Sequence, residues 1–300
     1  MTVLKVMDKP NHDIRKIVFI PKYPQMNTIL VAVDFTSNAE NAARYALGLA
    51  SDTKSRVTLV HGTHLPLVSD VQFDITASLD SMHTQAKKDM DLLASKLSKK
   101  FPKVKITAHV EIGFVGEILR KLSKKSEVSL VTLGIGPADK FSEVVFGSTS
   151  TALAGSIATP VLIIPEKASY KGLSRICLSF DGNKLPTGTG LKTVAELKEH
   201  FDSKVYYAHV MDENYPIKDE SSLRSVFTLL NDEQKNVHFL KSIKGKKVEM
   251  IEDFGRRYKI NLLVMVAREH NFLWRLIHER NTKKMAFSTS RPLLVLAEKK

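Results

Sequence analysis

Short apolar segments alternate with amphipathic segments along most of the chain. Runs such as Leu130–Leu133 and Val161–Ile164 are almost wholly apolar, which is typical of parallel strands buried on both faces. Between such runs the apolar residues recur at helical spacing, as in the segment that begins at Ser37. A regular alternation of strands and helices predicts an α/β fold with a doubly wound, parallel sheet.

The segment after the first apolar run carries the clearest helix signals. Ser37 is followed three residues later by Glu40, so we predict a capping box and a helix that starts at Ser37. The apolar face of this helix consists of Ala39, Ala42, Ala43, Ala46, Leu47 and Ala50. By contrast, Val104–Ile112 alternates apolar and polar residues, which predicts a strand near an edge of the sheet.

The same order of apolar segments occurs twice, which indicates an internal repeat. The similar pairs are Ile29–Thr36 with Ile176–Asn183, Val57–His64 with Val205–Asp212, Ser129–Gly136 with Asn261–Arg268, and Thr159–Lys167 with Arg291–Lys299. We therefore predict two tandem Rossmann-like domains, each with a five-stranded parallel sheet, at residues 26–168 and 173–300. Residues 1–25 lie outside the repeat and are interpreted as an N-terminal extension.

The two copies differ in length between their second and fourth strands, where the second copy is shorter. We expect the loss in the helix after the third strand, because Glu111–Ser126 can hold a full helix and Glu252–Lys259 offers much less. The linker Glu166–Gly172 is short. Because it leaves little freedom, the copies are expected to pack on each other.

The length and composition of the chain limit its number of domains and indicate the compartment in which it works. The chain has 300 residues, enough for about two domains of roughly 150 residues. Cys177 is the single cysteine, so no intrachain disulfide can form, and we expect a reducing cytoplasm. No apolar run reaches the ~20 residues that span a bilayer, and we expect no membrane association.

The chain is basic, with a formal net charge of +13. A basic surface suits anionic partners such as nucleotides, nucleic acid or acidic lipid. The excess of basic residues is spread over both halves, and the densest run, Lys96–Lys105, is interpreted as a solvated helix end and its loop. No aromatic or arginine-rich stripe accompanies the charge, so nucleic acid is an unlikely partner from sequence alone.

Leu133–Thr149 is the segment most suggestive of chemistry, because it joins a buried strand to the predicted helix Ser150–Ala158. Gly134 allows a sharp turn and close backbone approach to a ligand. Gly147, Ser148 and Thr149 open the helix, whose free N–H groups and dipole favour phosphate. An ordinary strand-to-helix loop with a serine N-cap carries the same residue types, so glycine spacing alone leaves both interpretations open.

The repeat, the turn at Asp34 and the loop from Gly134 to Ser148 resemble the universal stress protein family, and the resemblance extends over both halves. Nucleotide-binding members carry a G-x2-G-x9-G-[S/T] loop, and Gly134, Pro137, Gly147 and Ser148 reproduce its spacing. Pro137 replaces the second glycine and removes one N–H donor. Nucleotide binding is therefore expected to be weaker than in the family.

The resemblance implies a site for ATP or AMP in the first half, and leaves open whether Mg²⁺ accompanies the nucleotide. Asp34 would hold the ribose, the backbone of Ala32 and Val33 would face the base, and Gly62 would line the adenine pocket. The alternative for Asp34 is a loop aspartate that caps backbone N–H groups. The predicted cofactor-binding residues are Ala32, Val33, Asp34, Gly62, Leu133, Gly134, Pro137, Gly147, Ser148 and Thr149.

The second copy departs from the loop pattern. Its four motif positions hold Val266, Glu269, Glu279 and Arg280. Two carboxylates would oppose a phosphate, so we expect no nucleotide binding of the family kind there, although Asp181 matches Asp34.

Family members commonly dimerise through their last strand. The resemblance therefore implies that Pro160–Ile164 and Pro292–Leu296 meet as an internal pseudo-dimer. Exposed apolar strand edges also need covering on general grounds. Further association into a homodimer is left open.

No nucleophile–base–acid arrangement and no Walker-type loop can be found in the sequence. His61 and His64 could form half of a metal site, but a structural histidine at a strand end is preferred and no metal site is expected. We expect a stress-response binding or signalling module without enzymatic activity. The alternatives are a structural or protein-interaction member of the same fold that binds no nucleotide and, ranked below it, a weak ATPase.

Overall fold

The computed structural model describes residues 26–64, 75–136, 153, 156–180, 189–211, 226–232, 236–241, 247–267 and 291–297. The strands are β1 (Thr28–Ala32), β2 (Arg56–Thr63), β3 (Ile106–Ile112), β4 (Val128–Ile135), β5 (Val161–Pro165), β6 (Arg175–Phe180), β7 (Lys204–Met211), β8 (Asn236–Lys241), β9 (Leu262–Ala267) and β10 (Leu293–Ala297). The helices are α1 (Ser37–Thr53), α2 (Ile75–Lys100), α3 (Val115–Leu122), α5 (Thr189–Phe201) and α7 (Lys247–Arg257).

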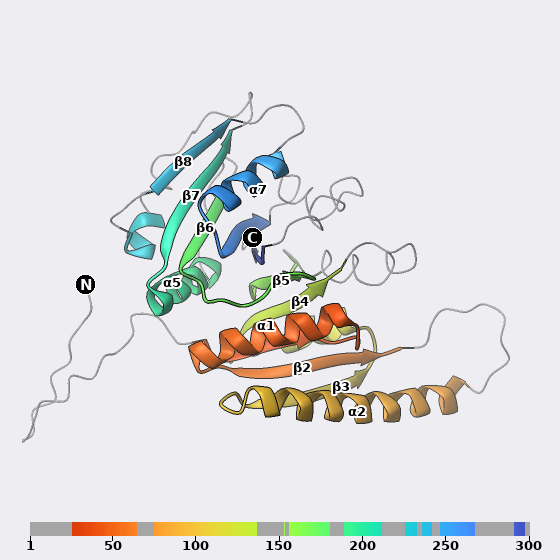
Figure 1. The fold of residues 1–300 in the computed structure, drawn as a ribbon. Helices are drawn as coiled ribbons and strands as arrows, with labels where there is room; N and C mark the ends of the chain where they lie inside the picture. Colours follow the sequence, from red (N-terminus) through yellow and green to blue (C-terminus); the bar gives the residue numbers. More distant parts are fainter. Residues whose placement is uncertain are drawn as a thin grey trace, which may run out of the picture.

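The strands form one ten-stranded sheet in the order β3-β2-β1-β4-β5-β10-β9-β6-β7-β8 (Figure 1). Neighbouring strands from β3 to β5 are parallel, and so are those from β10 to β8. Each half therefore has the strand order 3-2-1-4-5 when its own strands are counted along the chain. The predicted α/β fold with parallel sheets is confirmed.

The two halves are joined by β5 and β10, which pair antiparallel. Leu294 lies opposite Leu162, and Leu293 and Val295 lie opposite Ile163 and Val161. These strands overlap the segments Pro160–Ile164 and Pro292–Leu296, which the family resemblance led us to expect together. Because each apolar strand covers the other's edge, neither edge is left open to pair with another chain.

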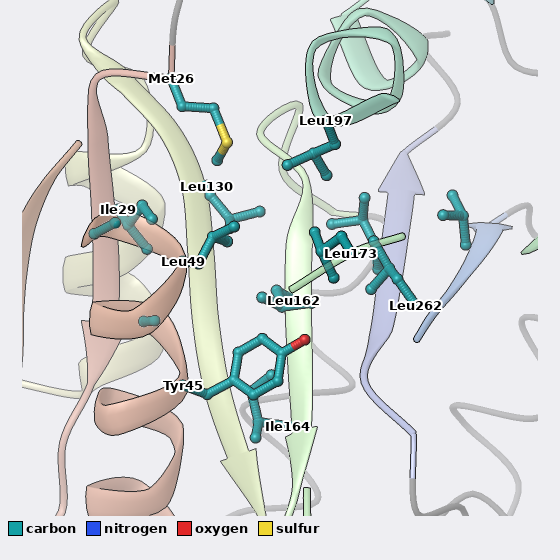
Figure 2. Packing of buried hydrophobic residues seen from close by; sticks show 14 of the residues in the cluster. Met26, Ile29, Tyr45, Leu49, Leu130, Leu162, Ile164, Leu173, Leu197 and Leu262 are labelled. Carbon is teal, nitrogen blue, oxygen red and sulfur yellow. The ribbon is translucent and has the colours of Figure 1, made fainter. Parts of the chain in front are cut away.

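One apolar core runs under both halves. Tyr45 and Leu49 of α1 pack toward β4 and β5, and side chains of the second half continue the same cluster. Figure 2 shows this continuity through Leu130, Leu162, Leu173, Leu197 and Leu262. A second cluster lies on the other face of the sheet and includes Leu119 of α3 and Phe254 of α7. The sheet is therefore buried on both faces, as its apolar strands require.

α1 begins at Ser37, as predicted, but its N-terminal cap differs from the predicted capping box. Thr36 is the N-cap, and its hydroxyl accepts a hydrogen bond from the Ala39 N–H at 3.3 Å. Glu40 does not reach back toward Ser37 but accepts hydrogen bonds from Arg44 and Lys96, at 2.7 and 2.9 Å. The predicted capping box is therefore wrong, because Thr36 is the N-cap and the position three residues later is Ala39, not Glu40. The Lys96 hydrogen bond lowers the pKa of Glu40. The predicted apolar face of α1 is buried.

The shortening of the second copy also lies elsewhere than expected. The helix after its third strand, α7, has 11 residues, whereas its counterpart α3 has 8. Residues 64–105 separate β2 from β3 and contain the 26-residue α2, while only residues 212–235 separate β7 from β8. The expectation was wrong because α7 begins at Lys247 and so includes residues before Glu252–Lys259. The edge position of the third strand is confirmed, since β3 ends the sheet.

The linker lies against α1. The Asn41 side chain donates hydrogen bonds to the carbonyl oxygens of Pro165 and Ala168, at 3.2 and 3.0 Å. The Tyr170 hydroxyl donates to Asp52 at 2.6 Å, and burial, with Asp52, raises the pKa of Tyr170. The Tyr170 ring passes 2.5 Å from where a Cβ on Gly48 would lie. Any side chain at that helix position would displace the linker.

The junction predicts a clear stability difference between buried and exposed leucines. Leu162 and Leu294 are 2% and 1% exposed, whereas Leu92 on α2 is 70% exposed. Leu162→Ala or Leu294→Ala should lower the free energy of unfolding by about 2–5 kcal/mol, and Leu92→Ala should change it by less than about 0.5 kcal/mol. Urea unfolding followed by circular dichroism measures both. Equal effects at the three positions would contradict the continuous core.

An aromatic cluster joins β7, β8 and α7 in the second half. The His238 ring lies 5.0 Å from that of Phe254, 4.8 Å from that of Tyr258 and 5.9 Å from that of Tyr206, between centroids. Burial among these rings, helped by the Lys204 ammonium, lowers the pKa of His238. The neutral imidazole is thus the form that fits this packing.

This lowered pKa predicts an acid-sensitive term in stability. Because the folded state binds a proton at His238 less readily than the unfolded state, the stabilisation is present above the unfolded histidine pKa of about 6.5 and is lost as the pH falls. His238→Phe should flatten the decline of unfolding free energy between about pH 7 and pH 5. His200→Phe, at an exposed position on α5, is the matched control. An unchanged pH profile in His238→Phe would contradict the assignment.

Candidate functional site

The first-half residues predicted to bind nucleotide come from strands that are neighbours in the sheet. Asp34 follows β1, Gly62 lies near the end of β2, and Gly134 near the end of β4. β1 pairs with both β2 and β4. The strand order reverses between β1 and β4, which is where doubly wound sheets open a crevice for ligands. The predicted residues Pro137, Gly147, Ser148 and Thr149 lie outside the described residues.

The first turn of α1 packs closely on the end of β4. A Cβ on Gly134 would lie 2.5 Å from the carbonyl oxygen of Asn38, and one on Gly136 would lie 1.8 Å from its side-chain Nδ2. Leu133 points to the opposite face and is buried in the second cluster. These glycines therefore let helix and strand approach each other. This packing role is separate from the ligand approach that the sequence suggested.

Asp34 organises the turn that leads into α1. Its Oδ1 atom accepts hydrogen bonds from the Thr36 N–H at 3.0 Å and from the Thr36 hydroxyl at 2.6 Å. The intervening Phe35 has a φ of 64°, in the left-handed region that a non-glycine residue enters at a cost. Asp34 thus performs the backbone-capping role that was the alternative in the sequence. Its ribose contact stays a prediction.

The backbone groups of Val33 already have partners. Its N–H donates to the Val60 carbonyl at 2.8 Å, and its carbonyl oxygen lies 2.7 Å from Nδ1 of His61. The His61 ring also packs on Phe35, with centroids 4.7 Å apart. Ala32, the last residue of β1, is buried at 2% exposure. A base at this edge would compete with hydrogen bonds that the protein makes to itself.

Gly62 lies under the loop between β3 and α3. A Cβ there would be 2.5 Å from the Gly113 carbonyl oxygen and 2.6 Å from the Val115 nitrogen. The Gly113 N–H donates to the Thr63 carbonyl at 2.8 Å, which holds the loop in place. Gly62 is needed for this approach, and its place in an adenine pocket stays a prediction.

Asn38 is a residue of the site that the sequence did not single out. Its amide lies over Gly136, and its buried Oδ1 has no hydrogen-bond partner among the described residues. A polar residue in the first turn of a helix, facing glycines two apart on a strand, is the signal that could have found it. The spacing alone does not say which strand the helix meets.

The equivalent edge of the second half is described only in part. Val266 is buried in β9 at 3% exposure. Asp181, Glu269, Glu279 and Arg280 lie outside the described residues. The expectation that this half binds no nucleotide stays a prediction. In the part of the chain that the structure describes, no three His, Cys, Asp or Glu side chains gather as a possible metal site.

The fold and its strand order define a Rossmann-like α/β protein built from two similar halves. The model of the universal stress protein family matches residues 26–165. The family resemblance found in the sequence is thus confirmed for the first half of the chain, whose residues 26–165 match the family model. This match ends before β6 and does not cover the second half. The second half has the same strand order as the first.

Two solved structures are similar to nearly the whole chain. A universal stress protein from Archaeoglobus fulgidus DSM 4304 is 17% identical, with a TM-score of 0.66, over 91% of this chain and 97% of its own. A functionally unknown protein from Pseudomonas aeruginosa PAO1 is 14% identical, with a TM-score of 0.52, over 91% and 93%. These similarities support the fold over both halves.

No curated protein matches the sequence. Among the helices that the structure describes, none combines the length and the apolar character needed to cross a bilayer.

Gly134, near the end of β4, and Gly136, just after it, predict different couplings to Asn38. Gly136→Ala meets the Asn38 side chain, so its cost should fall in an Asn38→Ala background. Gly134→Ala meets the Asn38 backbone oxygen, so Asn38→Ala should not relieve it. Overpacking of this kind costs about 1–3 kcal/mol, and urea unfolding of the single and double variants gives both coupling energies. Equal coupling for both glycines would contradict the described packing.

Proposed function

We propose that this protein is a stress-response binding module that takes an adenine nucleotide, ATP or AMP, at the carboxyl edge of its first half. The observation that carries the proposal is the position of Asp34 and Gly134 at the carboxyl ends of β1 and β4, the neighbouring strands between which the strand order reverses, within the residues that match the family model. Its output is a change in binding or association, without catalytic turnover of the nucleotide.

The phosphate half of the proposal rests on the loop from Gly134 to Ser148, whose spacing fits the family pattern. The base half receives less support, because the Val33 backbone groups already bond to Val60 and His61. Pro137 also lacks the N–H that a glycine would offer. We therefore expect modest affinity, with most of the binding energy at the phosphates.

A second candidate is a protein-interaction member of the same fold that binds no nucleotide. The close packing around two of the predicted site glycines favours it, since protein atoms fill the space beside Gly62 and Gly134. On this proposal the glycines serve only the fold. A ligand titration separates the two candidates directly.

The nucleotide proposal predicts saturable binding of labelled ATP or AMP to the full chain, with and without Mg²⁺. Gly147→Asp should reduce affinity at least ~10-fold, because a carboxylate would face the phosphates. Ser126→Asp adds the same charge at an exposed turn before β4 and should leave affinity unchanged. Isothermal titration calorimetry measures both. Absence of binding at millimolar nucleotide would reject this proposal in favour of the second candidate.

A further inference from the structure

Parallel strands place all the turns that precede them on one edge of a sheet, and in the first half these turns are rich in lysine. Lys54 and Arg56 lie at the start of β2, Lys103 and Lys105 precede β3, and Lys125 precedes β4. The remaining basic residues at this amino edge are Lys99 and Lys100, at the end of α2, and Lys124. All of these side chains are exposed.

Backbone hydrogen bonds show that these turns are direct neighbours. The Val57 N–H donates to the Lys105 carbonyl at 3.0 Å, and the Arg56 N–H to the Asn27 carbonyl at 2.8 Å. The Thr28 N–H donates to the Glu127 carbonyl at 3.0 Å. The strand starts therefore form an unbroken row from β3 through β2 and β1 to β4. At about 4.8 Å between strands, this row is about 14 Å across.

Little acidic charge balances this row. Glu127 is the one acidic residue at positions 54–56, 99–105 and 124–127, and Asp52, two residues before Lys54, accepts a hydrogen bond from the Tyr170 hydroxyl. Within the described part of the chain, the salt bridges of lysine go to Glu40 and Glu111, from Lys96 and Lys121. The lysines of the turns before β2, β3 and β4 thus form no salt bridge among the described residues, and their charge can attract an anionic partner.

We propose that this basic amino edge, defined as Lys54, Arg56, Lys99, Lys100, Lys103, Lys105, Lys124 and Lys125, binds the phosphate backbone of a nucleic acid without reading its sequence. A narrow row of charges matches the linear array of phosphates on a strand. A lipid surface would favour a broad face. Among the described residues, the exposed large apolar side chains Phe35, Ile112 and Phe114 lie at the opposite edge or its loops, and Met82 and Leu92 lie along α2. None of them lies in the turns of the basic edge, so these turns offer no apolar anchor for a bilayer.

The proposed contact is electrostatic and indifferent to the bases. The edge carries lysines and one arginine, and that arginine donates to Asn27 at 2.7 Å. Lysine ammonium groups act as point charges that attract phosphate and lack the planar fork that reads base edges. The edge also lies on the opposite side of the sheet from the candidate nucleotide site, so both can be occupied together. The sequence spreads these residues between positions 54 and 125, and only the parallel sheet gathers them.

The test uses the full chain and a fluorescein-labelled, 20-nucleotide single-stranded polyuridine. Fluorescence anisotropy should show binding that weakens steeply with salt. The triple variant Lys103→Gln, Lys105→Gln, Lys125→Gln should weaken binding at least ~10-fold at low salt and lower the magnitude of the log–log salt slope by about 2, at roughly 0.7 per lost phosphate contact.

The control triple, Lys87→Gln, Lys88→Gln, Lys192→Gln, removes the same charge from exposed positions on α2 and α5 and should leave the slope nearly unchanged. Equal weakening by both triples would overturn the proposal, because net charge alone would then explain the binding. Absence of RNA binding at 50 mM salt would also overturn it. So would binding to phosphatidylglycerol vesicles without binding to RNA, which would assign the edge to a membrane surface.

Discussion

The antiparallel pairing of β5 with β10 holds the two halves of the protein together. It joins two parallel five-stranded units into one sheet through three residue pairs centred on Leu162 and Leu294. If the two halves were separate domains, each would expose an apolar strand at its edge. Here these two strands pair with each other, and the core continues from α1 into α5. Because the junction is antiparallel, the carboxyl edges of the two halves point in opposite directions. The two edges cannot share one ligand.

α1 connects the candidate site with this junction. Its N-cap, Thr36, is fixed by Asp34, and its first turn rests on the end of β4. Further along the same helix, the Asn41 side chain donates hydrogen bonds to the carbonyl oxygens of Pro165 and Ala168. Asp52 accepts a hydrogen bond from the hydroxyl of Tyr170 in the linker. One helix thus contacts both the carboxyl end of β4 and the segment that leads into the second half. A change at the candidate site that moved α1 would have to break these contacts or carry the linker with it.

The two edges of the first half have different chemical characters. The carboxyl edge holds the Asp34 turn, the packed glycines and the exposed rings of Phe35 and Phe114. The amino edge is a row of lysines. A parallel sheet produces this separation because every strand starts on one edge and ends on the other. Ligand recognition at one edge and polyanion attraction at the other can therefore exist in one domain without overlap.

The local spacing of apolar residues was enough to predict the alternation of strands and helices, the repeat, the buried face of α1 and the edge position of β3. The sequence also identified the family through motif residues such as Gly134 and Ser148. Only the tertiary structure showed that Thr36 and not Ser37 caps α1, and that Gly62 and Gly134 accommodate neighbouring backbone. The tertiary structure also showed where the second half is shorter, and that lysines far apart in the sequence lie along one edge of the sheet. These features depend on which elements meet in space, and residue spacing along the chain carries no record of that.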